Sequence, residues 1–375
     1  MTDASTKLTL KVNGQIYSGW KSVSIRQGIE QIAGTFELSI TDRWPDQTLQ
    51  WSISPGEFCE VLIGEDPVIT GYVDKVSTSY DAGSHTISVV GRDKTGDLVD
   101  CSAPSVSFSS LSFLQIASKL AEPFDIKVID QTIEGGKGKS PRRVSNLAKW
   151  STQNGESVHR TLERIARSEG VMLVSDSKGS LLITRSGLGG KCIDSLELGK
   201  NILKASSEQN HSALYSEITV KGQSSAAGAS QFDLSRAQPK ASVKREVNAT
   251  SGSKVGRYRP LVVVAESQAD AARCQTRARW EVSNREAKAR RISVTVQGWR
   301  QSDGSLWGVN KLVKLVCPWM RVDGQFLIAS ISMRLDESGT TSDLELVDPR
   351  AFDELAEIPQ PAAGPSSGKF NVVGK

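Results

Sequence analysis

The stretch VVGRDKTGDLVDCSA, residues 89–103, marks the point where the pattern of the sequence changes. It places several charged side chains and a cysteine behind a short apolar run, so it is either a reactive site or the exit from a buried strand. No histidine lies nearby in the sequence to act as a base, and a nucleophile needs such a base to be activated. We therefore interpret the stretch as the end of a strand, followed by a short helical turn that Asp93 or Thr95 caps.

Before this stretch, polar and apolar residues alternate in short runs. KLTLKV at residues 7–12 is the first run, and the NG dipeptide at 13–14 predicts a tight turn into a return strand. Further runs follow, separated by Gly, Asn, Asp or Pro. Short strands with such turns between them are typical of a small antiparallel barrel, and we place this first β domain at residues 1–97.

After this stretch, residues 98–190 predict an α+β module. Apolar residues recur at helical spacing in 109–124 and in 155–170, with the short strand DIKVID between the two helices. VMLVSDSKGSLLITR then predicts a hairpin. GLGGK at 187–191 predicts a linker, because it lacks the GxxxxGK[ST] spacing of a phosphate loop.

The second half of the chain predicts a second β domain that an insertion interrupts. Alternating runs at 200–222 and 291–348 repeat the strand pattern of the first domain. Residues 223–290 form the insertion, and its first part, 224–256, is poor in large apolar residues and predicts a long mobile loop. Residues 349–375 are rich in Pro, Gly and Ser and predict a flexible tail. The fold class is therefore α+β, mainly β, with two related β-barrel-like domains flanking an α+β module.

The insertion also predicts one long helix at 267–291, with Ser267 as its cap, and this helix is strongly basic. Arginines can neutralise phosphates, and an aromatic ring can stack on a base. The same face could instead meet an acidic partner protein or stay solvated, and the residues leave these interpretations open. The candidate contacts for a partner or a phosphate are Arg273, Arg277, Arg279, Trp280, Arg290 and Arg291.

Composition narrows the function further. The net charge of +4 is too small to indicate nucleic-acid binding by itself. Five cysteines and three histidines are scattered without the spacing of a metal site, so we expect no metal, no cofactor and no catalytic residue. The N-terminus lacks the features of a signal peptide, and no run is long enough to span a membrane, which predicts a soluble protein made in a cytoplasm. We expect a structural or interaction protein that is not an enzyme and has no small-molecule substrate.

Several phrases occur together and in a characteristic order. They are YSGWKSVSIRQGIEQIAGTFELSI, ITGYVDKVS, GRDKTGDLVDCSA, ERIARSEGVMLVSDSKGSLLITR, YSEITVKGQ, RYRPLVVVAES and SLWGVNKLV. In this order they resemble the baseplate hub proteins of Mu-like contractile-tailed phages, part of a wider group with late control D proteins, tail hubs and the N-terminal part of VgrG proteins. The resemblance covers about residues 8–348 and is loose in the 224–256 loop and in the tail.

The resemblance implies a homotrimer in which each subunit contributes two related β domains to a pseudo-sixfold ring. Such a ring would join the sixfold tail tube to the threefold central spike and surround a channel through which genomic DNA passes without sequence-specific binding. The implied partners are the spike, the tube protein and other baseplate proteins. The implied location is the virion tail baseplate, assembled in the host cytoplasm. Because DNA must slide through the channel, we expect the Arg-rich helix to face away from the lumen.

One departure and two alternatives accompany the resemblance. VgrG proteins continue into a spike, whereas here a short tail follows the second β domain, so we expect the spike to be a separate polypeptide. The same ring would also serve a DNA-free contractile injection machine, such as a tailocin or a type VI-like system. A nucleic-acid-binding protein that uses the Arg-rich helix is the further alternative.

Overall fold

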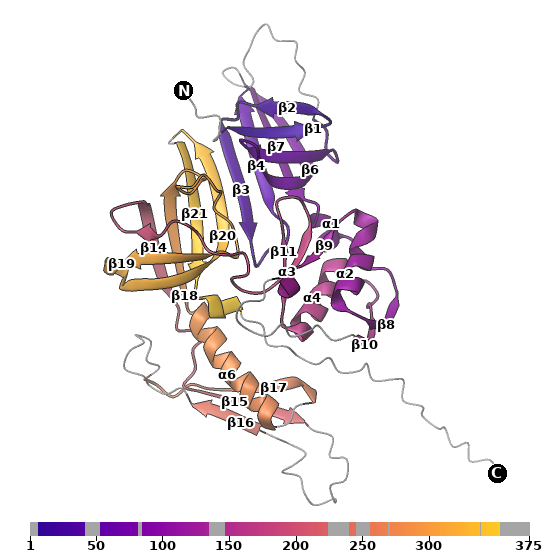
Figure 1. The fold of residues 1–375 in the computed structure, drawn as a ribbon, viewed down its shortest axis with the longest axis vertical. Helices are drawn as coiled ribbons and strands as arrows, with labels where there is room; N and C mark the ends of the chain where they lie inside the picture. Colours follow the sequence, from indigo (N-terminus) through magenta and orange to yellow (C-terminus); the bar gives the residue numbers. More distant parts are fainter. Residues whose placement is uncertain are drawn as a thin grey trace, which may run out of the picture. The chain divides into compact units, whose positions relative to one another are not determined.

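The structure, a computed structural model, describes residues 7–41, 53–81, 85–134, 147–223, 240–244, 256–268, 271–337 and 339–352 (Figure 1). The chain divides into two compact units. The first unit comprises Met1–Ala213 and Ser283–Glu354, and the second comprises Leu214–Val282 and Leu355–Lys375. The predicted flexible tail lies outside the described residues from residue 353 onward. Within the described residues, no helix is long and apolar enough to cross a membrane.

The first unit begins with a run of antiparallel strands, as the alternating sequence predicts. The turn at Asn13–Gly14 has φ angles of 49° and 77°, the left-handed backbone that an NG hairpin turn requires. Alternate residues of these strands are buried, among them Leu10 and Phe36. The strands are β1 (Leu8–Val12), β2 (Gln15–Ser18), β3 (Ser22–Gly28), β4 (Thr35–Thr41), β5 (Phe58–Ile63), β6 (Asp66–Tyr80) and β7 (His85–Asp93).

The α+β module follows β7 and has its own core. Ser112 caps helix α2 and forms a capping box with Gln115, so the helix begins at Phe113. The residues before Ser112, predicted as helical, form strand β8 instead. Helix α4 ends at Gly170 with φ 65°, as predicted. The module contains α1 (Gly96–Asp100), β8 (Ser107–Leu111), α2 (Phe113–Ala121), β9 (Val128–Asp130), α3 (Gln131–Glu134), β10 (Leu147–Ser151), α4 (Val158–Glu169), β11 (Met172–Ser175) and β12 (Leu181–Thr184).

The second group of strands in the first unit extends the same sheet. Within the described residues this sheet has 13 strands, and β20 pairs with β3 to join the two groups. One hydrophobic core contains residues of both groups, including Phe36 and Trp299. The two predicted β domains are thus hydrogen-bonded into one sheet. The added strands are β13 (Leu196–Glu197), β14 (Ile202–Gln209), β18 (Arg290–Gln297), β19 (Leu312–Cys317), β20 (Val322–Asp336) and β21 (Gly339–Val347).

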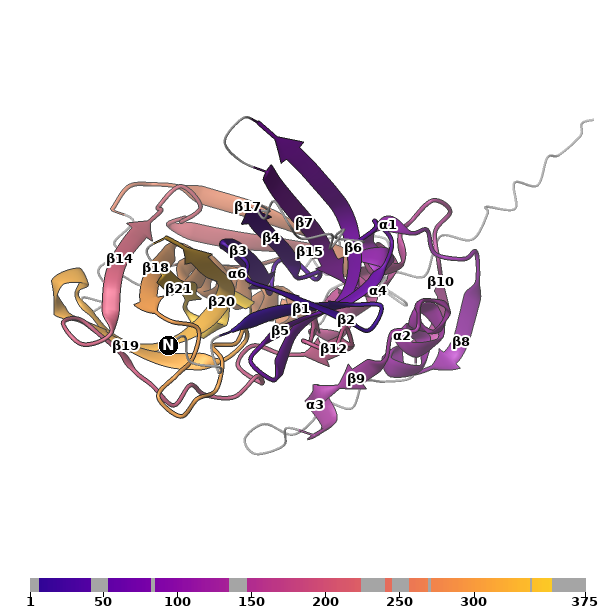
Figure 2. The ribbon, with the colours of Figure 1, turned by 90° about the horizontal axis from the view of Figure 1, so that it is seen from above.

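The strand order of this sheet contains a repeat. The first four strands run β14-β18-β21-β20, and the next four run β3-β4-β7-β6. In each group the last strand is long and pairs with the strand that follows it in the sequence, β20 with β21 and β6 with β7. Both long strands, β6 and β20, have 15 residues and carry a bulge against that partner. The bulges lie between Val73 and Lys75 and between Ile328 and Ser330. In Figure 2 the far ends of β6 and β7 project beyond the neighbouring strands.

The second unit holds a smaller sheet of β15 (Glu217–Gln223), β16 (Lys240–Lys244) and β17 (Pro260–Gln268). The range 200–222, expected in the second β domain, is therefore divided: β14 pairs with β18, whereas β15 pairs with β16 and β17. Strand β15 alternates apolar and polar residues, whereas β14 is mostly exposed, and neither pattern identifies the strand with which it pairs. Strand β16 lies inside the range predicted as a mobile loop, and residues 224–239 and 245–255 lie outside the described residues.

The long basic helix begins later than expected. Helix α6 spans Ala271–Lys288, and Ser267 belongs to strand β17 instead of capping the helix. The β-branched run before Ser267 favours a continued strand over an early helix start. The helix ends before Arg290 and Arg291, which begin strand β18.

Candidate functional site

The stretch that opens the α+β module is anchored by Asp93, whose residue is only 3% exposed. One carboxylate oxygen accepts hydrogen bonds from the backbone N–H of Gly34 at 2.5 Å and from the hydroxyl of Ser175 at 2.7 Å. The other accepts from the backbone N–H of Thr95 at 2.9 Å and from its hydroxyl at 2.5 Å. Burial raises the pKa of Asp93, and the hydrogen bonds oppose this rise. The side chain thereby ties the strands, α1 and the β11–β12 hairpin together.

The cap predicted for α1 has a different geometry. Thr95 occupies the N-cap position, but its hydroxyl donates to Asp93 and makes no capping bond to the helix. Sequence reasoning recognised both residues and missed the four-donor arrangement. A signal for it was present, since an acidic residue followed two positions later by threonine is typical of a side chain that accepts from the nearby backbone.

The charged residues around Asp93 pair with one another. Arg92 donates to Asp74 and to Asp100, both at 2.7 Å. The hydrogen bond to Asp100 is the main cause that raises the pKa of Arg92, and the same bond lowers the pKa of Asp100. Lys94 pairs with Asp125 at 3.0 Å. The charge density that suggested chemistry is thus engaged in ion pairs within the chain.

Two glycines permit strands β6 and β7 to approach closely at this point. A Cβ on Gly71 would lie 2.0 Å from the carbonyl oxygen of Arg92, and one on Gly91 would lie 2.3 Å from the carbonyl oxygen of Tyr72. Neither distance is compatible with any larger residue unless the backbone moves. Glycine at positions 71 and 91 therefore allows β6 and β7 to lie this close together just before the α+β module begins.

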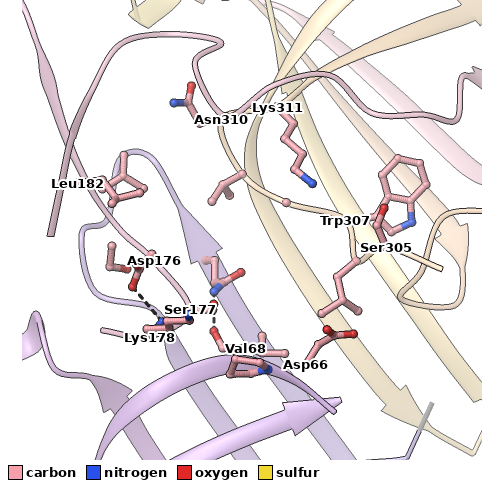
Figure 3. Close-up of a pocket in the computed structure, with 18 of the residues that line it drawn as sticks. Asp66, Val68, Asp176, Ser177, Lys178, Leu182, Ser305, Trp307, Asn310 and Lys311 are labelled. Atoms are coloured by element: carbon pink, nitrogen blue, oxygen red, sulfur yellow. Dashed lines mark hydrogen bonds between the residues drawn. The ribbon is translucent and has the colours of Figure 1, made fainter. Parts of the chain in front are cut away.

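A pocket of about 710 Å³ lies in the first unit (Figure 3). Ser175, which donates to Asp93, is one of the residues that line it. Most of its residues come from the β3 and β6 strands, from the β11–β12 hairpin and from the segment 303–311, and the others are Gln131 of α3, Gly189 and Met333 of β20. Hydrogen bonds hold the wall: Gln27 donates to the carbonyl of Val68 at 3.0 Å, and the backbone N–H of Lys178 donates to Asp176 at 2.9 Å. No histidine or cysteine is among the described residues that line it, so it contains no nucleophile–base pair of the Cys–His or Ser–His kind.

Histidines and cysteines do not assemble into a reactive centre elsewhere in the described part of the chain. His159 on α4 is partly buried, and burial lowers its pKa. None of the five cysteines forms a disulfide bond, and burial raises the pKa of Cys59 to about 12 and that of Cys192 to about 11. Within the described residues, no group of three or more His, Cys, Asp or Glu side chains is placed to hold a metal ion.

The predicted contact residues on α6 differ in their surroundings. Arg277 pairs with Glu281 at 2.8 Å, and its guanidinium lies 4.8 Å from the centre of the Trp280 ring. Arg279 is exposed. Arg273 is in the helix, but its side chain lies outside what the structure describes. Two of the residues expected to contact a ligand, Arg277 and Trp280, therefore stack on each other.

Arg290 and Arg291 stand at the start of β18 in the first unit. Arg290 donates to the carbonyl of Met320 at 2.9 Å. Arg291 pairs with Glu30 at 2.7 Å and with Glu345 at 2.5 Å. The structure therefore does not place the six predicted contacts on one helix face: four are on α6 and two are on a strand.

Models of known protein families match most of the chain in three blocks. Residues 7–93 match the N-terminal domain of the Mu phage baseplate assembly protein GpP-like family, and residues 95–185 match the second domain of the baseplate hub protein gp44-like family. Residues 270–355 match the fourth domain of the Mu phage baseplate assembly protein GpP. The boundary between the first two blocks falls beside Asp93, where the first group of strands ends.

Individual relatives agree with these matches. The chain is 32% identical to the baseplate hub protein gp44 of Escherichia phage Mu over 354 residues, which cover 93% of this chain and 89% of the relative. It is similar to the crystal structure of the 43 kDa tail protein of prophage MuSo2 from Shewanella oneidensis, with 35% identity, 93% and 100% coverage, and a TM-score of 0.78.

More distant structures share the fold. The tail protein from Neisseria meningitidis MC58 is 23% identical with a TM-score of 0.74, over 94% of this chain and 98% of that protein. The E. coli c3393 protein, a component of the type VI secretion system, is 11% identical with a TM-score of 0.51, over 94% and 80% of the two chains. The blocks, the relatives and the mainly β fold confirm the resemblance noted in the sequence. The chain belongs to the family of Mu-like phage baseplate hub proteins.

Proposed function

We propose that three copies of this chain form a ring that joins the sixfold tail tube to the threefold central spike of a contractile tail. The observation that carries this proposal is the repeated strand order β14-β18-β21-β20 and β3-β4-β7-β6. A chain with two equivalent strand groups presents six such groups when three chains assemble. Three copies can therefore meet a sixfold partner on one side and a threefold partner on the other.

Membership of the hub family supports a structural role without catalysis or a small-molecule substrate. The site around Asp93 agrees with this role, since its charged groups fix the position of the α+β module relative to the strands. Its four donors leave the carboxylate no role as a base in the described geometry. We place the protein in the virion tail baseplate, assembled in the host cytoplasm.

The proposed partners are the central spike, the tube protein and other baseplate proteins, with genomic DNA passing through the channel. Of the candidate contact residues whose side chains the structure describes, Arg279 on α6 is the exposed arginine, so it is the one expected to contact a partner or a phosphate. Arg277, Arg290 and Arg291 already bind groups of their own chain. The basic part of α6 is expected to face away from the lumen, because strong phosphate binding would retard DNA.

Electron microscopy of the purified chain tests the ring directly. Class averages of negatively stained particles should show a ring with a central opening and threefold symmetry that approaches sixfold. Compact particles without an opening, at all protein concentrations, would contradict the proposal. Addition of the spike protein should leave the ring intact and fill one end of the opening.

A further inference from the structure

The two long strands differ in how completely their edges are paired. On one edge, β20 pairs with β19 over Val322–Leu327 and then with β3 over Ser330–Leu335. On the matching edge, β6 pairs with β5 over Asp66–Tyr72. Beyond Tyr72, no described strand pairs with that edge of β6, up to Tyr80. Among the described strands, none fills beside β6 the position that β3 fills beside β20.

Strand β14 also has an edge with which no described strand pairs. It corresponds to β3, since β14 precedes β18 in one repeat as β3 precedes β4 in the other. Strand β3 pairs on both edges, with β4 and with β20, whereas among described strands β14 pairs only with β18. An unpaired strand edge offers backbone N–H and C=O groups to another chain. The described sheet therefore has one open position beside β6 and one unmatched strand, β14, at its opposite end.

The bulges align the two repeats residue by residue. Lys75 follows the bulge in β6 as Ser330 follows the bulge in β20. Ladder pairs then carry the alignment across the sheet. Phe36 pairs with Gly91 and with Ile25, and Ile292 pairs with Leu346 and with Ser207. Ser207 of β14 is therefore the equivalent of Ile25 of β3.

We infer that β6 of one copy pairs antiparallel with β14 of a second copy, in the register of the internal β20–β3 junction. Met333 pairs with Ile25 inside the chain, so Thr78 lies opposite Ser207 of the second copy. By the same register Lys75 lies opposite Asn210, and Tyr80 lies opposite Ala205. The inference rests on the proposed ring and names the surface that forms it.

Side-chain faces agree with this register. Val76 and Ala205 are both partly buried residues packed against the core of the sheet, and the register places them on the same face. Tyr80, whose residue is 85% exposed, corresponds to Leu335, which packs against the same core. Lys75 lies diagonal to Glu208, within reach of an ion pair. A shift by one residue would bring core-facing side chains of one strand beside outward-facing side chains of the other.

A second copy is the occupant that the fold itself supports. The internal junction shows that these two repeats pair through this edge. The contact is head to tail, since each copy offers β6 at one surface and β14 at another, and such contacts close into rings when the rotation fits. Across the internal junction, Arg291 of β18 also clamps Glu30, which follows β3, and the residue equivalent to Arg291 is the uncharged Thr35. Without that clamp, the contact between copies is weaker than the internal junction.

Cysteine pairs test the register. One chain carries Thr78→Cys and another carries Ser207→Cys, both with Cys101→Ser to remove the exposed native thiol. Both target residues are exposed, so the variants should fold. The matched control replaces Ser206 instead of Ser207, since neighbouring residues of a strand point to opposite faces. The chains are mixed, oxidised and separated on a non-reducing gel, and sedimentation of the unmodified chain reports assembly independently.

The inference predicts a two-chain disulfide product from the 78/207 mixture and at least tenfold less from the 78/206 control. A chain that carries both Thr78→Cys and Ser207→Cys should give disulfide-linked species of up to three chains and none larger. An assembly seen in sedimentation without a 78/207 product, or with equal yields in the control, would overturn the strand pairing and leave the ring in place. A monomer in sedimentation with no product would overturn the ring and the pairing together. A monomer with the 78/207 product would support the pairing and contradict the ring.

Discussion

Met333 of β20 pairs with Ile25 of β3, and this pairing joins the first strands of the chain to its last. The backbone N–H of Ile29 continues the contact by donating to the carbonyl of Ala329 at 2.8 Å. Because both strand groups also share one hydrophobic core, they cannot separate without exposing it. The two related groups therefore form one continuous sheet with one core.

Replacing Gly91 by alanine should destabilise the chain by roughly 1–3 kcal/mol, because the new methyl group overlaps neighbouring atoms. It would lie 2.3 Å from the carbonyl oxygen of Tyr72 and 2.5 Å from the ring of Phe36. The matched control is Gly324→Ala, where the nearest atom is 3.8 Å away. Urea unfolding measures both, and equal stabilities for the two variants would refute the steric account.

Asp93→Asn should destabilise the chain by about 1–3 kcal/mol. Asparagine offers one acceptor oxygen where the carboxylate offers two, so at least one buried donor, such as the backbone N–H of Gly34 or of Thr95, loses its partner. Asp125→Asn is the control, because the side chain of Asp125 is exposed and an exposed pair contributes about 1 kcal/mol or less. Thermal unfolding of both variants at neutral pH compares them, and an Asp93 variant as stable as the control would be inconsistent with the anchor.

Glu156 gives a pH dependence of known sign. Burial alone would raise its pKa, but hydrogen bonds from Arg164 and Thr161 outweigh burial and lower the pKa from 4.5. Because the pKa of Glu156 is lower in the folded chain than in the unfolded chain, its charged form stabilises the fold above pH 4.5. This stabilisation is lost as the pH falls through the pKa that Glu156 has in the folded chain.

Glu156→Gln should therefore be less stable than the original chain by about 1–2 kcal/mol at pH 7, and the difference should shrink as the solution is acidified below pH 4.5. Denaturant unfolding at a series of pH values measures the difference. Glu163→Gln serves as the control, because Glu163 pairs with Arg167 at the surface of α4. A difference that stays constant with pH would show that the charge of Glu156 does not matter.

Tyr80→Glu should weaken assembly at least tenfold while leaving the stability of the single chain within about 0.5 kcal/mol, the usual range for a surface substitution. The residue is almost fully exposed in the chain and buried in the proposed contact, where the new carboxylate would be desolvated. Ile16→Glu is the control, because Ile16 is an exposed apolar residue on β2, which lies three strands from β6 in the described sheet and is not part of the proposed β6–β14 pairing. Sedimentation at several concentrations compares the variants, and an equal loss of assembly in both would argue against a specific role for Tyr80.

Sequence patterns predicted the elements that depend on interactions between residues close together in the sequence. The buried face of α4, with Val158, Leu162 and Ile165, follows from helical spacing, and Gly170 ends the helix as expected. The NG turn after β1 also follows from two residues alone. In these cases the interactions that decide the structure span only a few positions of the sequence.

Partners distant in the sequence could not be predicted in this way. Strands β14 and β15 are neighbours in the sequence, yet they belong to different sheets because β14 pairs with β18 and β15 pairs with β16 and β17. Arg290 and Arg291 continue the basic pattern of α6, but Arg291 finds Glu345 and Glu30 on other segments, and a strand forms there instead. Asp93 was recognised as a possible cap, while two of its donors, Gly34 and Ser175, come from far along the chain.

A native mass spectrum of the purified chain, taken at several concentrations, tests the central claim most directly. The account predicts a dominant species at three times the chain mass of 40.5 kDa, which dissociates to single chains on dilution. A single chain at every concentration, or a dominant species with two or four chains, would contradict the proposed ring.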